Sequence, residues 1–479
     1  MSHLPQTIHE ARRLLRSGAM TSVELTEAYL ERIAWMEPDI RAYLHVAEAQ
    51  SLAQARLADE RMAAGQDTPL LGVPLGVKDI INVQGMPATA GSRILEGFRP
   101  PYEATVVRKL REQGAVFLGK LNTDEFAMGW STENSAYGVT HNPWALDRVP
   151  GGSSGGPAAA VAAGEAIAAL GTDTGGSVRQ PASWTNTVGL RPTYGRVSRY
   201  GVIAFASSLD QVGPITRDVR DSALLLEAIA GHDPKDSTTF SDAVPHYADM
   251  LDGGVKGMRF GLPREYFTEG MHPGVEKATR EAVARLRDLG AIVEEVSLPH
   301  TGYGMPVYYL IATAEASANL SRYDGVRYGY SAKAPDLQEN YKLTRGRGFG
   351  EEVKRRILLG TYALSAGYYD AYYLKAQKVR TLIRADFNAV FEKYDALVAP
   401  VAPIPPYRIG EAPTDPVSLY LLDVMTLPSA LAGVPALAVP AGFVEEDGAK
   451  LPVGVQFIGR PLDEATLFRI GRAFEMHEK

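Results

Sequence analysis

The alternation of apolar and polar positions predicts a chain that starts with helices. In the first 60 residues, apolar side chains recur at helical spacing, at Leu25, Tyr29 and Ile33. Thr21 and Glu24 stand three residues apart just before them, which fits a capping box at the start of this helix. Because the residue before a proline disfavours helical geometry, we expect the helix to end before Pro38.

From residue 70 onward the pattern changes to one of short apolar runs between helical stretches. The run 70–83, LLGVPLGVKDIINV, is rich in β-branched residues and punctuated by Gly and Pro, which predicts a buried strand and turn. A helix is predicted from Thr105 to Gln113, followed by a strand at 115–121, and helical patterns dominate 306–395. Core strands are expected at 396–403, 436–443 and 451–459, with a hairpin turn at Asp447-Gly448. This alternation predicts an α/β fold.

The stretch 150–184 is distinguished by its small residues. PGGSSGGP (150–157) leads into AAAVAAGEAIAAL (158–170), which has almost no polar face and predicts a helix buried on most sides. Pro157 suits the first position of that helix. GTDTGGSVRQPASW (171–184) follows. With no repeat and no long linker, we expect one structural domain, in which a helical segment at 1–65 packs on the core formed by 66–479.

Composition narrows the chemistry. Lys and Arg number 49 against 56 Asp and Glu, a net charge of −7, which argues against binding nucleic acid or anionic membrane over the whole chain. The absence of cysteine excludes disulfides, thiolate metal sites and a cysteine nucleophile. The N-terminus lacks the apolar core of a signal peptide, and no run of 18 apolar residues follows. We therefore expect a cytoplasmic protein without membrane contact.

Three reactive side chains stand in unusual surroundings. Lys78 lies between apolar neighbours, and burial of a lysine lowers its pKa towards neutrality, so that its amine can accept a proton. Ser153 and Ser177 each lie in a glycine-rich segment, and a serine needs a base of this kind to become a nucleophile. The backbone of Thr174, Gly175, Gly176 and Ser177 offers successive N–H groups for an oxyanion hole. Taken singly, a serine in a glycine-rich loop is more often a turn residue than a nucleophile, and a lysine next to an aspartate is more often a solvated charge than a base.

Together these motifs resemble the amidase signature family: Lys78 in KD, then GGSSGG around Ser153, then Ser177 in GTDTGGSVRQP. The resemblance implies a central mixed, twisted sheet covered by helices on both faces. It also implies a Ser–cis-Ser–Lys triad, in which Ser177 is the nucleophile, Ser153 bridges through a cis peptide bond and Lys78 is the base. No metal is expected.

Further segments are similar to the A subunits of glutamyl-tRNA(Gln) amidotransferases over roughly residues 10–475, among them KLNTDEFAMG, STENSAYG and LPVGVQFIG. Such a subunit hydrolyses glutamine to glutamate and ammonia. Partner B and C subunits would use the ammonia, with ATP and magnesium bound there, and tRNA would be met at most indirectly. No cofactor is expected in this chain. The implied substrate-binding residues are Met128, Trp130, Tyr308, Arg356 and Asp423. Arg356 would grip an α-carboxylate, unless it is only a surface helix charge, and Asp423 would pair with an α-ammonium.

Several positions depart from the pattern usual in those A subunits, and all lie near the motifs. They are Ile80, Trp130, Pro157, the run Trp184-Thr185-Asn186, and Ala430. One explanation is drift with compensating changes. The other is altered specificity, in which Trp130, together with Trp184, forms an aromatic wall for an aryl amide or carbamate. A stand-alone amidase or urethanase is therefore an alternative function, and we expect the isolated chain to prefer aryl substrates over glutamine.

Other interpretations fit less well. Gly151 to Gly155 also matches the nucleophile elbow of α/β-hydrolases, but that fold needs a late histidine, and only His300 and His477 come late. The run PGGSSGGP could be taken for a phosphate-binding loop, but it lacks the Lys-Ser/Thr pair that completes a Walker motif. A non-catalytic scaffold subunit, with its pocket closed by Trp130, would not need Lys78 and both serines. A basic cluster from Arg345 to Arg356 fits either tRNA contact or pairing with Glu351 and Glu352.

Overall fold

A single large sheet forms the centre of the molecule. The structure, a computed structural model, describes residues 4–267, 269–413, 415 and 420–477. Within these residues, eleven strands form one sheet in the order β1-β3-β2-β4-β6-β5-β10-β11-β9-β7-β8. Their bounds are β1 Tyr43–Val46, β2 Pro74–Lys78, β3 Val116–Leu121, β4 Ala168–Asp173, β5 Val188–Arg191, β6 Gln211–Thr216, β7 Arg259–Pro263, β8 Ile292–Val296, β9 Ala396–Pro400, β10 Ala436–Glu446 and β11 Ala449–Ile458.

The sheet is mixed, as expected. β2 runs parallel to both of its neighbours, β3 and β4, and β7 runs parallel to β8 and β9. The other pairs are antiparallel, including the closing hairpin of β10 and β11. Asp447 and Gly448 connect that hairpin and both have positive φ, 50° and 77°, which is the geometry of the two-residue turn predicted there.

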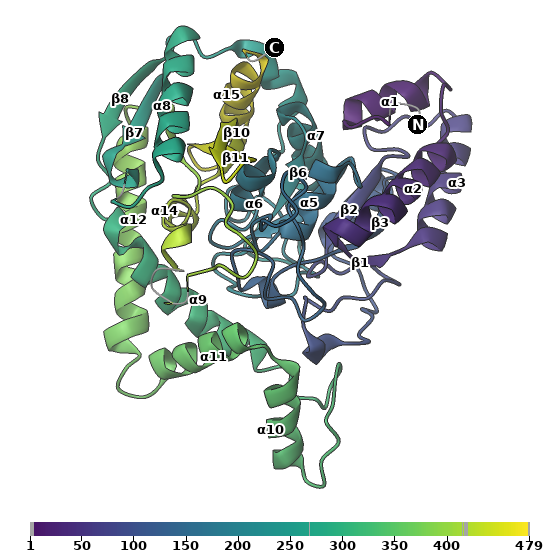
Figure 1. Cartoon of the computed structure of the whole chain (residues 1–479), viewed down its shortest axis with the longest axis vertical. Helices are drawn as coiled ribbons and strands as arrows, with labels where there is room; N and C mark the ends of the chain where they lie inside the picture. Colours follow the sequence, from purple (N-terminus) through teal and green to yellow (C-terminus); the bar gives the residue numbers. More distant parts are fainter. Residues whose placement is uncertain (1–3, 268, 414, 416–419, 478–479) are drawn as a thin grey trace.

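Helices flank the sheet, which confirms the α/β class (Figure 1). The longer ones are α1 Ile8–Arg16, α2 Ser22–Ile40, α3 Glu48–Ala63, α4 Thr105–Glu112, α5 Gly155–Ala163, α6 Arg179–Thr185, α7 Val219–Ile229, α8 Pro273–Asp288, α9 Gly304–Leu320, α10 Leu337–Gly348, α11 Glu351–Leu364, α12 Lys375–Phe391, α14 Leu427–Ala432 and α15 Glu464–Met476. In Figure 1, α5 and α6 lie at the centre, α1 to α3 on one side, and α8 and α12 on the other.

The N-terminal segment shows one expected and one unexpected feature. Thr21 and Glu24 form the predicted capping box at the start of α2. The expected end before Pro38 is wrong, because α2 continues to Ile40 with the proline inside its last turn. There Pro38 removes only one backbone hydrogen bond, and the burial of Ile40, which is 1% exposed, offsets this loss. The segment also contributes β1, which pairs with β3 at the edge of the sheet.

The Ala-rich helix α5 is buried along almost its whole length, as predicted. The helix begins at Gly155, so Pro157 occupies its third position. The expectation that Pro157 takes the first position is therefore wrong. The missing N–H still costs little, because the first four N–H groups of a helix have no acceptor within it.

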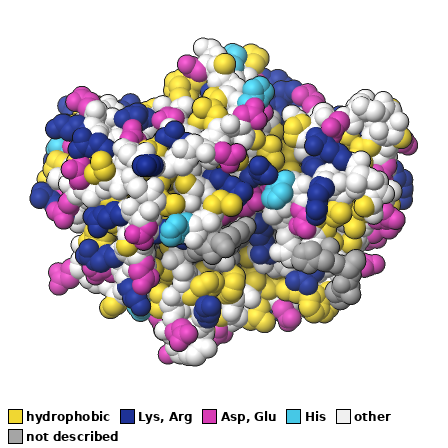
Figure 2. Space-filling model, turned by 90° about the horizontal axis from the view of Figure 1, so that it is seen from above, with side chains coloured by type: hydrophobic (Ala, Val, Ile, Leu, Met, Phe, Trp, Pro, Cys, Tyr) yellow, Lys and Arg dark blue, Asp and Glu magenta, His cyan; other side chains and the backbone are white. Residues whose placement is uncertain are grey.

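Two features of the structure concern possible binding partners: the length and hydropathy of the helices, and the distribution of charge on the surface. None of the helices in the described part of the chain is long and apolar enough to cross a membrane. On the face seen from above, acidic and basic side chains are interspersed and do not form one patch of a single sign (Figure 2).

Candidate active site

The carboxyl end of β2 brings Lys78 to the glycine-rich segments. Because β2 and β4 are parallel neighbours, the residues that end both strands meet at the same edge. Lys78 is fully buried, and its Nζ lies 2.7 Å from Ser153 Oγ, 2.9 Å from Ser154 Oγ and 3.1 Å from Thr172 Oγ1. Burial lowers its pKa to about 7. The amine can therefore lose its proton near neutral pH.

The aspartate next to Lys78 does not neutralise it. Asp79 pairs instead with Lys120, at 2.9 Å between Nζ and Oδ1, and accepts a hydrogen bond from the backbone of Thr89 at 2.8 Å. Both partners of this ion pair are buried. Lys78 thus keeps three hydroxyl groups as its neighbours, which can exchange protons with an amine.

Ser153 lies in a tight connection between the glycines and α5. The Gly152–Ser153 peptide bond is cis, and Ser153 is fully buried. Glycine is required at 152, because a Cβ there would lie 2.2 Å from Asp124 Oδ2 and 2.6 Å from the backbone N of Ser131. The segment is therefore pressed against the backbone of residues 130–131.

Ser177 is the most accessible of the three candidate residues, at 8% exposed. Its carbonyl oxygen accepts a hydrogen bond of 3.1 Å from the N–H of Ser154, which brings the two serine segments side by side. A direct hydrogen bond between the hydroxyls of Ser153 and Ser177 is not among the contacts of the described residues. The structure thus joins Lys78 to Ser153 through side chains, and Ser177 to this pair through the backbone.

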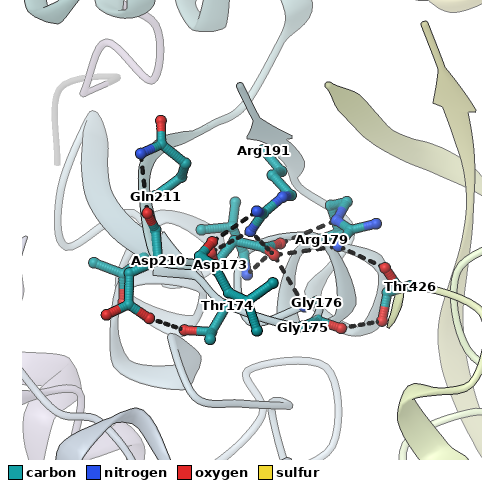
Figure 3. Close-up of polar contacts among 12 residues, drawn as sticks. Asp173, Thr174, Gly175, Gly176, Arg179, Arg191, Asp210, Gln211 and Thr426 are labelled. Atoms are coloured by element: carbon teal, nitrogen blue, oxygen red, sulfur yellow. Dashed lines mark hydrogen bonds and ion pairs between the residues drawn. The ribbon is translucent and has the colours of Figure 1, made fainter. Parts of the chain in front are cut away.

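The segment before Ser177 is built around a buried carboxylate, Asp173 (Figure 3). Asp173 accepts hydrogen bonds from Arg179 and Arg191, each at 3.0 Å. Burial alone would raise the pKa of Asp173, but these two guanidinium groups hold it below its usual range. The same carboxylate accepts the N–H of Gly176 at 3.0 Å. Of the N–H groups expected for an oxyanion hole, that of Gly176 is therefore engaged, which leaves those of Thr174, Gly175 and Ser177.

The remaining contacts of this loop fix its course. The Thr174 hydroxyl donates to Asp210 at 2.7 Å, and the Thr426 hydroxyl donates to the carbonyl of Gly175 (Figure 3). Gly176 has a φ of 140°, which side chains rarely adopt, and a Cβ there would lie 2.3 Å from Thr426 Oγ1. The loop is held from three separate segments of the chain.

Three of the expected substrate-binding residues, Tyr308, Arg356 and Asp423, lie close to one another beside this loop. A Cβ on Gly175 would lie 2.8 Å from the phenol oxygen of Tyr308, so Tyr308 contacts the nucleophile segment directly. Asp423 lies near Arg356, and its pKa is raised to about 8 by burial, against the opposing effect of the Arg356 charge. Met128 is also buried, and its carbonyl accepts a hydrogen bond from Asn134.

Arg356 lies inside a group of aromatic rings and is not a surface charge, since it is only 2% exposed. Its guanidinium carbon is 5.1 Å from the Trp130 ring, and 5.4 to 5.9 Å from the rings of Tyr309, Phe205 and Tyr420. Its Nε donates to Glu352 at 2.7 Å. Two other residues of the basic cluster pair locally, Lys354 with Glu351 and Arg355 with Glu352.

The two tryptophans among the unusual positions have different surroundings. Trp130, 2% exposed, packs against Tyr420 with ring centroids 5.4 Å apart. Trp184 is fully buried in a separate cluster with Val149 and Ala402, and its indole N–H donates to the carbonyl of Ile404. The expectation that Trp184 helps form a substrate wall is therefore wrong, because its ring belongs to the core.

Sequence reasoning overlooked the role of Asp173, Arg179 and Arg191. A signal for it exists: these charges interrupt a segment made otherwise of small and apolar residues, and buried charges must be paired. The histidines needed by an α/β-hydrolase lie elsewhere. His300 is paired with Asp386 at 2.8 Å, and His477 is exposed just after the end of α15.

One group in the described residues has the spacing of metal ligands: His9, Asp218 and Asp221. These side chains bind one another and the start of α1, with Asp221 accepting the N–H of Ile8. They anchor α1 on α7, and none of them contacts Lys78 or either serine.

Comparisons with known proteins agree with this geometry. The family model described as Amidase matches residues 24–468. The A subunit of the glutamyl-tRNA(Gln) amidotransferase of Chloroflexus aurantiacus is 60% identical over 470 residues, which cover 98% of this chain and 96% of that protein. The crystal structure of the corresponding A subunit from Thermotoga maritima is 45% identical, with a TM-score of 0.81, and 98% and 94% of the two chains are covered. A bacterial aryl acylamidase of the amidase signature family is 27% identical, with a TM-score of 0.85 and coverage of 98% and 96%.

Proposed function

The chain belongs to the amidase signature family, and from this premise we propose that it is the glutaminase subunit of a glutamyl-tRNA(Gln) amidotransferase. It hydrolyses glutamine to glutamate and ammonia, and the ammonia serves transamidation in a partner subunit. The observation that carries the chemistry is the buried amine of Lys78, 2.7 Å from Ser153 Oγ. The identity with named A subunits over nearly the whole chain supports the substrate.

In the proposed mechanism, Ser177 Oγ attacks the amide carbon and forms an acyl-enzyme. Its proton passes to Ser153 Oγ and from there to Lys78, and the same route returns a proton to the leaving amine. The N–H groups of Thr174, Gly175 and Ser177 hold the oxyanion. Water then releases the acid. Burial of Lys78 lowers its pKa to about 7, against the opposing effect of the Asp124, Asp173 and Asp210 charges, and so makes the neutral form that the first step needs available.

Substitution of the triad tests the chemistry. Ser177→Ala should abolish turnover, and Lys78→Ala should reduce it by several orders of magnitude. His300→Ala should leave it largely intact, because no histidine takes part. A His300→Ala enzyme as inactive as Ser177→Ala would contradict the mechanism.

The proposed role implies partners and cofactors outside this chain. We propose assembly with B and C subunits in the cytoplasm, where a partner binds ATP and magnesium, and where tRNA contacts this chain at most indirectly. Glutamine hydrolysis by the chain needs no metal, so a chelator should not slow it. Copurification with B and C subunits, followed by Gln-tRNA formation from glutamine, tests this role.

A second function is favoured by one observation, the aromatic surroundings of Arg356. The Trp130 ring lies 5.1 Å from the guanidinium carbon, beside the group that would hold a substrate carboxylate in the glutaminase. A stand-alone amidase or urethanase for aryl amides or carbamates would use these rings for stacking. Hydrolysis rates of the isolated chain on glutamine, asparagine, anilides and aryl carbamates decide between the two. No hydrolysis of any of them, with or without partners, would leave a non-catalytic scaffold.

A further inference from the structure

One hydroxyl group, that of Thr132, bridges both ends of the segment that carries Ser153. Thr132 Oγ1 donates to the carbonyl of Gly151 at 2.9 Å and accepts the N–H of Gly155 at 3.0 Å. The three residues between these glycines include Ser153. Thr132 is fully buried, so water does not compete for these bonds.

The backbone of Thr132 is strained. Its φ is 64°, in the left-handed region that a β-branched residue rarely adopts. Glycine or asparagine would occupy this position at lower cost, and strain of this kind concentrates at functional sites. A residue that is unfavourable for the backbone, yet makes two hydrogen bonds to the Ser153 segment, points to a function of its hydroxyl.

A buried carboxylate holds Thr132 in this conformation. Asp124 accepts the N–H of Thr132 at 3.0 Å and that of Asn134 at 3.1 Å, and it is fully buried. Thr132 and Gly155 pack closely, because a Cβ on Gly155 would lie 2.2 Å from Thr132 Oγ1. A displacement of Thr132 must therefore move the Ser153 segment with it.

The opposite side of the segment is held from the helix that follows Ser177. Gln180, in α6, accepts the N–H of Gly152 at 2.9 Å and donates to the carbonyl of Trp130 at 3.1 Å. Gln180 thus links the Ser153 segment to the residues that lead into Thr132. Removal of the Thr132 hydroxyl would release the carbonyl of Gly151 and the N–H of Gly155, while Gln180 still holds Gly152 and the backbone of Ser177 still holds Ser154.

We propose that Thr132 is a positioning residue of the amidase reaction, whose hydroxyl clamps residues 151–155 and holds Ser153 Oγ against Lys78 Nζ. This inference rests on the proposed function. Thr132 does not touch the substrate; it acts through the geometry of the proton relay. A relay atom displaced by about 1 Å can cost about a hundredfold in rate.

Three substitutions separate the hydroxyl from the strain. Thr132→Ser keeps the hydroxyl, Thr132→Val keeps the shape without it, and Thr132→Gly removes both the hydroxyl and the strain. We expect kcat to stay within about threefold for Thr132→Ser and to fall about a hundredfold for Thr132→Val and Thr132→Gly. Thr279→Val is the matched control, because this buried threonine, in α8, bonds only to its own helix.

Thermal stability and pH dependence distinguish positioning from general structural support. If Thr132 only supports the fold, activity follows melting temperature, and Thr132→Gly, relieved of strain, is the more active of the two variants that lack the hydroxyl. If it clamps the relay, both lose kcat whatever their melting temperatures. A loosened segment also admits water to Lys78, so the acid limb of the kcat profile moves to higher pH in Thr132→Val.

The outcomes remain distinct from a failure of the proposed function. Retained turnover in Ser177→Ala would refute the amidase mechanism itself. An inactive Ser177→Ala, together with a folded Thr132→Val that keeps the wild-type kcat and pH profile, would overturn the clamp alone. A Thr132→Ser enzyme as slow as Thr132→Val would also overturn it, because the hydroxyl would then not be the group that matters.

Discussion

Replacement of Trp130 by glycine should move the substrate preference from aryl substrates towards glutamine. The indole is 2% exposed, packs on Tyr420 and lies 5.1 Å from the guanidinium carbon of Arg356. Its removal takes away one aromatic pair for an aryl substrate, worth about 0.5–1.5 kcal/mol, or about two- to twelvefold in kcat/KM.

The effect on glutamine has the opposite sign. Because the Trp130 ring is one of four that surround the Arg356 guanidinium, we expect its removal to open part of this group to a substrate carboxylate. One hydrogen bond to a charged group contributes about 1.5–3 kcal/mol, so kcat/KM for glutamine should rise by about ten- to a hundredfold. The loss of a buried indole also costs about 3–5 kcal/mol of folding free energy, so rates must be compared well below the melting temperature.

The assay measures initial rates on glutamine, an anilide and an aryl carbamate, for the isolated chain and for the chain with partner subunits. Trp130→Phe keeps a ring and should lie between wild type and Trp130→Gly. Trp184→Phe is the matched control, because this buried indole belongs to a different cluster. Strong glutaminase activity of the wild type with B and C subunits, with neither substrate affected by Trp130→Gly, would refute altered specificity and leave the plain amidotransferase role.

Three further predictions concern the charges of the site. Because burial lowers the pKa of Lys78 to about 7 and the neutral amine is the base, kcat/KM should fall about tenfold per pH unit below 7; a flat profile from pH 5 to 7 would contradict this. The unfolded chain binds a proton on Lys78 at higher pH than the folded chain does, so the unfolding free energy of wild type, compared with that of Lys78→Met, should rise between about pH 7 and 10; denaturant titrations check the sign. Asp173→Asn breaks a buried ion network and should cost about 3–5 kcal/mol of stability as well as activity, whereas Glu112→Gln, at the exposed pair with Arg108, should cost about 1 kcal/mol or less; a similar loss in both variants would argue against the network.

Short-range patterns were sufficient for much of the fold and for the selection of candidate reactive residues. The capping box at Thr21 and Glu24, the turn at Asp447-Gly448 and the buried helix after Ser153 each depend on neighbouring residues, and all three are present. The desolvation of Lys78 also follows from its apolar neighbours in the strand, because they place it in the core with them.

Other features were decided by contacts between segments far apart in the sequence. Pro38 lies inside α2 because the helix continues as far as Ile40, whose side chain is buried. Trp184 is not part of the expected substrate wall, because its indole N–H donates to the carbonyl of Ile404, far away in the sequence. From the sequence, Arg356 could be a surface charge in a basic run. In the structure, aromatic rings from four separate segments surround its guanidinium group.

The sequence by itself determined which residues are the candidates for the chemistry, since a nucleophile, a relay and a base must be particular side chains in small, apolar surroundings. Only the tertiary structure decided which backbone groups are free to serve it. The N–H of Gly176 is engaged by Asp173, and the ends of the Ser153 segment are tied by Thr132. The physical reason is that a hydrogen bond depends on geometry across loops, which local periodicity does not encode.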